Sequence, residues 1–132
     1  MKSRRRPLVA AGIIERHDND ILIVRPVTAD DQARVWQFPR GLAAAEESAE
    51  AAMCRIAREQ LGVDVEIIVG QPPLVQPIDG KEVEARYFFC GILDGEPCLQ
   101  GYAELRWIPK SHLREYDFDR PSAEVVKWLL ET

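Results

Sequence analysis

The segment GLAAAEESAEAAMCRIAREQLGV, which begins at Gly41, constrains the fold more than any other part of the chain. Ser48 is a favoured residue at a helix N-cap, and Gly62 is the residue type that most often ends a helix in a left-handed conformation. Between them, small and aliphatic residues recur at helical spacing, and the carboxylate of Glu50 stands in the first turn. The segment therefore predicts a loop that opens at Gly41 and a helix from Ser48 to about Leu61.

The remaining chain carries the patterns of short strands separated by turns. Apolar, β-branched or alternating stretches predict strands at residues 8–14, 21–24, 35–38, 63–69, 83–93 and 103–108. The turn residues at 18–20 join the first two strands as a hairpin. Residues 71–80 contain several prolines, which predicts a loop, and Pro121 begins a second helix that ends near residue 130. Mixed strands with two helices favour a β-sheet packed between helices.

Size and composition fit one packed domain. The chain has 132 residues, of which 46% are hydrophobic and 30% charged, a composition typical of a folded core. The formal net charge of −5 argues against non-specific binding to nucleic acid or to a membrane. No stretch approaches the roughly 18 apolar residues of a membrane span. The basic cluster at residues 2–6 predicts a flexible N-terminus over residues 1–7, followed by a single domain over residues 8–132.

The cysteines do not form a recognisable metal or disulfide pattern. Cys54, Cys90 and Cys98 are odd in number, and no two of them form a CxxC pair. A zinc site or a disulfide framework is therefore not expected, and the pattern fits a reducing cytoplasm.

Gly41, Glu47, Arg55, Glu59 and Gly62 stand at the spacing of the Nudix box, G-x5-E-x7-R-E-U-x-E-E-x-G-U, where U is a bulky aliphatic residue. The chain therefore resembles the Nudix family. The lead-in WQFPRG is also similar to that of the family, and the stretch from GEPCLQGYAELRW to the C-terminus resembles the MutT-type branch that acts on 8-oxo-dGTP. The resemblance implies a Nudix-type α/β/α sandwich with a mixed β-sheet.

The resemblance also implies an activity and a cofactor. Nudix hydrolases cleave nucleoside diphosphates linked to a further moiety X, with Mg²⁺ or Mn²⁺ neutralising charge on the phosphates. The expected partner is thus a nucleotide or another nucleoside diphosphate derivative, and a homodimer is compatible with the family. No nucleic-acid or membrane partner is expected.

The predicted metal face departs from the family pattern. Positions 56, 59 and 60 share one face of the helix, because residues three and four apart are neighbours. The resemblance implies three glutamates there, and this chain has Ile56, Glu59 and Gln60. Magnesium requires hard oxygen ligands, which leaves Glu59 and Gln60 as the candidate metal ligands. We expect Mg²⁺ or Mn²⁺ to bind weakly in the absence of substrate.

The resemblance implies a further acid on a later loop, at the position of Gly101. Glu104 is the nearest substitute for it. Glu59, Arg55 and Glu104 are therefore the candidate catalytic residues. Glu59 has an alternative role as a surface partner of Arg55, and Glu47 is expected to be structural.

The resemblance implies that Trp36 and Phe38 line a nucleoside pocket, although both also fit a core strand. Ser122 stands where the 8-oxo-dGTP enzymes carry an asparagine that reads the purine edge, and its hydroxyl lacks the paired donor and acceptor of an amide. Arg25 is a candidate phosphate ligand or an exposed surface charge. Ile56 belongs either to the core or to an apolar lining of the metal pocket.

Three functional hypotheses follow. The chain is a Nudix hydrolase of reduced or shifted activity, a catalytically inactive nucleotide-binding module, or a protein-interaction module on a Nudix fold. The first predicts Mg²⁺-dependent turnover, and the second predicts ligand binding without product. The third predicts neither.

Overall fold

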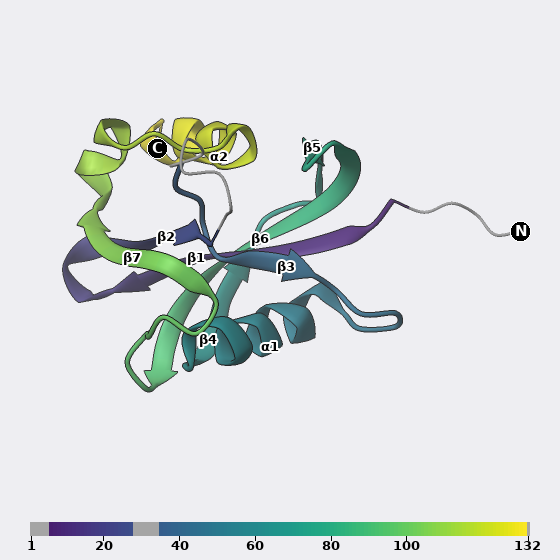
Figure 1. The fold of residues 1–132 in the computed structure, drawn as a ribbon, viewed down its shortest axis with the longest axis horizontal. Helices are drawn as coiled ribbons and strands as arrows, with labels where there is room; N and C mark the ends of the chain where they lie inside the picture. The colour runs from purple at the N-terminus through teal and green to yellow at the C-terminus, as the bar shows by residue number, and fades with distance from the viewer. Residues whose placement is uncertain (1–5, 28–34, 132) are drawn as a thin grey trace, which may run out of the picture.

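The computed structural model describes residues 6–27 and 35–131, which form a seven-stranded sheet with a helix on each face (Figure 1). The elements in chain order are β1 (Leu8–Arg16), η1 (His17–Asn19), β2 (Asp20–Pro26), β3 (Arg40–Leu42), α1 (Ala49–Leu61), β4 (Asp64–Gly70), β5 (Leu74–Ile78), β6 (Lys81–Asp94), β7 (Tyr102–Pro109), η2 (Lys110–Glu115) and α2 (Arg120–Leu130).

The sheet is mixed. Its main path runs β4-β6-β1-β2-β7, with β3 paired to β1 and β5 paired to β6. The strands β1 and β6 run parallel over a long register, and the other pairings are antiparallel. This arrangement brings β3, which precedes α1, against the first strand of the chain.

The two helices cover opposite faces of the sheet, with α2 above and α1 below it in the view of Figure 1. Because successive strand residues point to opposite faces, Ala10 and Ile14 of β1 pack in the core beside α1, whereas Val9 and Ile13 pack in the core beside α2. We call these the α1-side core and the α2-side core. Burying one large aliphatic or aromatic side chain contributes about 1.5–3 kcal/mol. The expected α/β/α sandwich is confirmed.

Helix α1 begins and ends at the residues that the sequence indicated. The Ser48 hydroxyl accepts a hydrogen bond from the Ala51 backbone N–H at 3.0 Å. Gly62 adopts φ 72°, and its N–H donates to the carbonyl of Arg58 at 3.1 Å. The predicted helix is therefore confirmed. Helix α2 is likewise confirmed, with the Asp119 carboxylate as its N-cap and Pro121 in its first turn.

The prediction of a loop over residues 71–80 is wrong for residues 74–78, because β5 pairs there with β6. Pro77 is tolerated because β5 has a pairing partner on one side only, so its missing N–H breaks no ladder. The prediction of a strand over residues 35–38 is also wrong. The backbone of Trp36 bonds instead to residues 117 and 119, and Gln37 forms an isolated bridge with Val24.

The loop predicted to open at Gly41 begins later, because Gly41 is the central residue of β3. Residues 1–5 of the predicted flexible N-terminus lie outside the described residues. Of the remaining two, Arg6 pairs with Glu82, and the Pro7 carbonyl accepts from the Glu84 N–H at 2.9 Å. That residues 8–132 form one domain stays a prediction.

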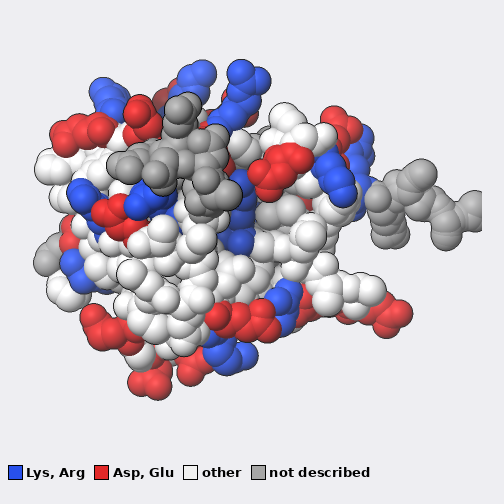
Figure 2. Space-filling model, in the orientation of Figure 1, with Lys and Arg blue, Asp and Glu red and all other residues white. Residues whose placement is uncertain are grey.

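Charges of both signs are mixed over the face shown in Figure 2. Within the described part of the chain, none of the helices has the length and hydropathy needed to cross a bilayer.

Candidate functional site

The central feature of the site is an arginine clamp between Arg55, in the middle of α1, and the loop before the helix. The Arg55 guanidinium donates from Nε and Nη2 to the two oxygens of Glu47, at 2.9 and 3.0 Å, and from Nη2 to the Leu42 carbonyl at 2.9 Å. Glu47 also accepts the Ala44 N–H at 2.8 Å. Two parallel bonds to one carboxylate fix both geometry and charge. The clamp therefore holds the end of β3 and the following loop against α1.

The electrostatics of the clamp follow from this geometry. Hydrogen bonds from Arg55, and then from the Ala44 N–H, hold the pKa of the Glu47 carboxyl below its ordinary value. The hydrogen bonds to Glu47, and to a smaller extent the contact with Glu59, raise the pKa of Arg55. Both groups are therefore charged at neutral pH, which fits the structural role expected for Glu47.

Glu59 lies one turn further along α1. One of its carboxylate oxygens accepts from Arg55 Nη1 at 3.0 Å, and its side chain is 60% exposed. The carboxylate is thus partnered and still open to solvent. Its role as a metal ligand stays a prediction beside its observed pairing with Arg55.

Ile56 is part of the α1-side core and is 1% exposed. A Cβ atom on Gly41 would lie 2.9 Å from Ile56 Cδ1, so the isoleucine fills the space between α1 and β3. Only glycine fits at position 41 without displacing this side chain. The interpretation of Ile56 as a core residue is confirmed.

Gln60 is held by a buried tyrosine. The Tyr102 hydroxyl donates to Gln60 Oε1, and burial raises the pKa of Tyr102 to about 12, so the hydroxyl keeps its proton at neutral pH. A Cβ atom on Gly101 would lie 3.4 Å from Gln60 Cβ and Cγ. Position 101 therefore does face α1, as the resemblance implies, but it supplies no carboxylate.

These residues do not make a magnesium site on their own. Position 56 is aliphatic, the Gln60 carbonyl oxygen already accepts a bond from Tyr102, and Glu59 shares its charge with Arg55. Across residues 6–27 and 35–131 there is no group of three His, Cys, Asp or Glu side chains placed to hold a metal. A near-octahedral shell of anionic oxygens is therefore not present.

Glu104, expected to replace the missing loop acid, pairs with two arginines instead. It lies 3.1 Å from Arg25 and 3.3 Å from Arg106. Burial raises the pKa of Glu104, but the hydrogen bonds from Arg25 and Arg106 together outweigh burial and lower it. Arg25 is consequently an ion-pair partner rather than an unpaired surface charge.

Glu104 also points away from α1. The β2–β7 register shifts between Arg25 and Pro26, so that Tyr102 packs in the α1-side core while Ile108 packs in the α2-side core. Glu104 and Arg106 share the face of Ile108 by alternation. In agreement, the Arg106 guanidinium lies 5.6 Å from the ring centroid of Trp36. The structure thus separates Glu104 from Glu59 by the sheet.

The expected nucleoside-binding residues pack in the α2-side core. Phe38 is fully buried and stacks on Phe118 at 5.6 Å between ring centroids, and Trp36 is 9% exposed. The Ser122 hydroxyl is buried and accepts the Phe38 N–H at 3.3 Å. These side chains therefore join α2 to the segment before β3, and their contact with a ligand stays a prediction.

A pocket of about 480 Å³ lies beside β3. We call it the β3 pocket. It is lined by Pro7, Val9, Pro26, Gln37, Arg40, Gly41, Leu42, Ile78, Asp79, Lys81 and Val83. Most of its lining comes from β1, β3 and the β5–β6 hairpin, with Pro26 at the end of β2, Pro7 before β1 and Gln37 before β3. Gly41 belongs to the Nudix box, and the resemblance implied a pocket-lining role for Gln37 together with Trp36 and Phe38; the other lining residues were not among the candidates. The arginine within WQFPRG was the available sequence signal, because it stands directly before the box glycine.

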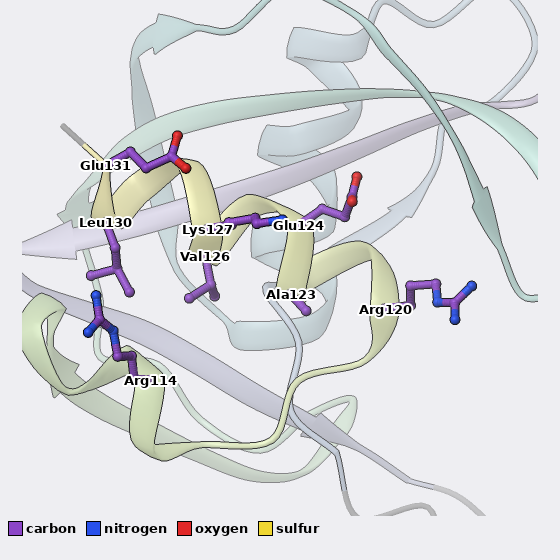
Figure 3. A pocket seen from close by; sticks show the side chains of 8 residues that line it. All are labelled: Arg114, Arg120, Ala123, Glu124, Val126, Lys127, Leu130 and Glu131. Atoms are coloured by element: carbon purple, nitrogen blue, oxygen red, sulfur yellow. The ribbon is translucent and has the colours of Figure 1, made fainter.

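A second hollow, of about 550 Å³, lies between η2 and α2 (Figure 3). Figure 3 shows Arg114 of η2 facing Leu130 of α2. This hollow is lined by no residue of α1 or β3, so it is separate from the clamp.

Comparison with known proteins agrees with this geometry. The family model described as NUDIX domain matches residues 5–129. Putative 8-oxo-dGTP diphosphatase 2 of Mycobacterium tuberculosis is 29% identical over 112 residues, which cover 84% of this chain and 79% of that protein. The CTP pyrophosphohydrolase of Escherichia coli is 39% identical over 59 residues, which cover 45% of this chain and 43% of that protein.

Two solved structures share the fold. The E. coli ORF135 protein superposes with a TM-score of 0.78 at 22% identity, covering 96% of this chain and 90% of that one. A structure reported for MutT from Aliivibrio salmonicida and Vibrio cholerae gives a TM-score of 0.75 at 26% identity, covering 96% and 98%.

Proposed function

Because the chain belongs to the Nudix family, we propose that it binds a nucleoside triphosphate, or another nucleoside diphosphate derivative, in the β3 pocket and hydrolyses it slowly. The relatives named for activity on 8-oxo-dGTP and CTP support a triphosphate as the ligand. The observation that carries the proposal is the continuity of pocket and clamp. Leu42 lines the β3 pocket, and its carbonyl accepts from Arg55.

The chain's own residues account for binding better than for turnover. Apolar walls such as Val9 and Val83 suit a nucleobase, and Lys81 adds a cation for an anionic ligand. The Glu47–Arg55 clamp fixes the loop along which phosphates would reach Glu59. Among the residues that face this region, Glu59 is the candidate that activity can least lose.

Nudix hydrolases generally use divalent metals such as Mg²⁺ or Mn²⁺, but the donor set on α1 does not fit a protein-held ion. We therefore propose that the nucleotide-free protein binds either metal weakly. Glu59 would be the one carboxylate ligand of the ion, and Gln60 would lie beside it as a neutral ligand. The missing carboxylates are the physical reason for a low rate, because each anion near a divalent cation contributes attraction of several kcal/mol at an effective dielectric of about 20.

The test has two stages. A thermal-shift screen of nucleoside triphosphates and nucleotide sugars, with and without Mg²⁺, identifies ligands, because a ligand that binds only the folded state raises Tm. Ligands that raise Tm then enter a product assay for release of a nucleoside monophosphate. Binding with slow, Mg²⁺-dependent release supports the proposal, and the absence of any nucleotide-induced shift contradicts it.

A catalytically inactive nucleotide-binding module is the second candidate. The burial of Ile56 and the bond between Tyr102 and Gln60 favour it, because positions 56 and 60 are expected metal-ligand positions and neither offers a free carboxylate. It predicts a thermal shift without product. A protein-interaction role would give neither. A cytoplasmic location and a homodimer stay predictions beside these functions.

A further inference from the structure

Arg40 occupies an unusual place in the β3 pocket. It is the first residue of β3, it pairs with Ala11 of β1, and its side chain is only 11% exposed. Its Nη1 atom lies 2.8 Å from Asp119 Oδ2, but this buried nitrogen has no partner in hydrogen-bonding geometry. The guanidinium therefore has a charge partner and still has N–H donors to satisfy.

Asp119 holds the guanidinium in place from the other side. Its Oδ1 atom accepts the Ser122 N–H at 3.0 Å as the N-cap of α2. Asp119 is thus fixed by a helix, and Arg40 is fixed by a strand. A side chain held between two rigid elements loses little further entropy on binding, which suits a residue that reads a ligand.

The guanidinium faces the N-terminus of α2, where it pairs with Asp119. Asp119 belongs to the N-terminus of α2, which covers the face of the sheet opposite α1. Leu42, at the other end of β3, leads to Arg55 and Glu59. A nucleotide with its phosphates towards α1 therefore places its base towards Arg40.

A second buried donor without a partner lies on the same face of β5 as the pocket wall. Gln76 is 5% exposed, its Oε1 accepts from the Tyr87 hydroxyl at 2.7 Å, and its Nε2 has no partner. Gln76 and the pocket-lining Ile78 are two apart on β5, so both side chains point to one face. Buried donors without partners are costly. Of these two donors, Arg40 lines the pocket itself and Gln76 lies next to the wall formed by Ile78, so this end of the pocket suits a ligand edge rich in acceptors.

We propose that Arg40 is the specificity-determining residue of the β3 pocket and selects bases that present two adjacent hydrogen-bond acceptors. Guanine offers O6 with N7, and cytosine offers O2 with N3. Adenine and uracil have no such pair, because a donor adjoins each candidate acceptor or the acceptors are separated. Arginine makes bidentate contacts of this kind with guanine in nucleic-acid recognition. This inference rests on the proposed nucleotide-binding function.

The experiment measures dissociation constants of GTP, CTP, ATP and UTP by calorimetry in EDTA, where metal-dependent turnover is suppressed. We expect GTP and CTP to bind at least about 10-fold more tightly than ATP and UTP, the lower part of the range for a bidentate contact. 7-Deaza-GTP, which lacks the N7 acceptor, should lose most of the advantage of GTP. This arm needs no mutation, so the inference stays testable even if a variant fails to fold.

Two variants complete the test. Arg40→Lys keeps the positive charge but not the planar fork, and we expect the GTP to ATP ratio to fall to near one. Lys81→Ala, at a second cation lining the same pocket, is the matched control and should weaken all four nucleotides alike. An unchanged ratio of GTP to ATP affinity in Arg40→Lys, or equal binding of all four nucleotides by the parent, overturns this inference but leaves the proposed function standing. Failure of the parent to bind any nucleotide overturns the proposed function as well.

Discussion

At the scale of single residues, Arg55 divides its guanidinium between one shielded carboxylate and one exposed carboxylate. Glu47 is 17% exposed and bound through both oxygens, whereas Glu59 is 60% exposed and bound through one. The first contact shapes the loop, and the second leaves a carboxylate free to contact a ligand. The two glutamates should therefore respond differently to neutralisation.

Glu59→Gln should remove whatever turnover the protein has and leave its Tm almost unchanged, because exposed ion pairs add little to stability. Initial rates of nucleoside monophosphate release and a melting curve check both parts. Glu66→Gln, at an exposed position on β4, is the matched control and should keep the parental rate. A Glu59→Gln protein that hydrolyses as fast as the parent would show that Glu59 is only a surface partner of Arg55.

The combined change Ile56→Glu, Gln60→Glu and Gly101→Glu should restore metal binding. Positions 60 and 101 already face each other, because a Cβ atom added at position 101 would lie 3.4 Å from Gln60 Cβ and Cγ. We expect metal affinity to rise at least about 10-fold, by the size of ligand-shell effects, with measurable release of a nucleoside monophosphate. A variant that folds and binds Mg²⁺ but hydrolyses nothing in a broad nucleotide panel would contradict the hydrolase proposal.

The cost of that design lies at one position. Ile56 is buried, so Ile56→Glu alone should lower the free energy of unfolding by about 2–4 kcal/mol through loss of packing and burial of a charge. Urea denaturation at neutral pH measures it. Gln60→Glu serves as the comparison and should cost less, because the Tyr102 hydroxyl can donate to a carboxylate.

At the scale of elements, the end of α1 depends on the left-handed backbone of Gly62. Gly62→Ala should destabilise the protein by more than about 1 kcal/mol, because φ is 72° and the new Cβ would lie 3.0 Å from the Cys98 sulfur. Gly80→Ala is a matched control, since φ there is 81° and no atom lies within 4 Å. Equal losses in urea denaturation would show that the Cys98 contact contributes nothing.

Local signals in the sequence were enough to predict α1, since Ser48 and Gly62 act on residues within one turn of themselves. Non-local pairing was harder to predict. The strand β5 was not predicted because it contains Pro77, which is tolerated at a sheet edge, and a sequence does not show that a strand will lie at an edge. Glu104 was expected near α1, and the register shift beside Arg25 turned it to the other face.

The site divides in the same way. The sequence predicted that Arg55 can pair with Glu59, because the two lie four residues apart on one helix, and the structure shows this pair. The bond between Arg55 and Glu47 was not predicted, because Glu47 lies before the helix and the course of the loop decides where its side chain points. The β3 pocket could not be predicted from spacing, since Val9, Arg40 and Val83 come from three strands whose pairing brings them together. Arg40 acquires its partner Asp119 only when α2 docks.

At the scale of the whole molecule, the clamp should make stability sensitive to acid. The pKa of Glu47 is lowered in the folded state, chiefly by Arg55, so its contribution is present above the unfolded value of 4.5 and is lost as pH falls through the lower folded pKa. Tm measured from pH 6 to pH 2 should therefore fall, and Glu47→Gln should flatten part of that fall. The neighbouring exposed Glu46→Gln should retain the parental profile, and identical profiles for all three proteins would contradict this prediction.

Metal titration tests the molecule as a whole, because any cluster of acids would respond. We expect calorimetric titration of the nucleotide-free protein with Mg²⁺ or Mn²⁺ to show little heat at sub-millimolar metal, since the described residues hold no group of three His, Cys, Asp or Glu side chains placed to bind a metal ion. An EDTA-treated sample is the reference. Tight binding would mean that other acids, such as Glu46 or Glu50, hold the ion.

The packing of Ile56 on Gly41 also bears on how this sequence can change under selection. A single substitution at position 56 towards a carboxylate lowers stability at once, while its benefit requires further changes at positions 60 and 101. Proteins tolerate only small losses before abundance falls. Stepwise evolution of a full metal site therefore passes through a destabilised intermediate. A protein with this core is expected to gain the metal ligands only after another substitution has raised its stability.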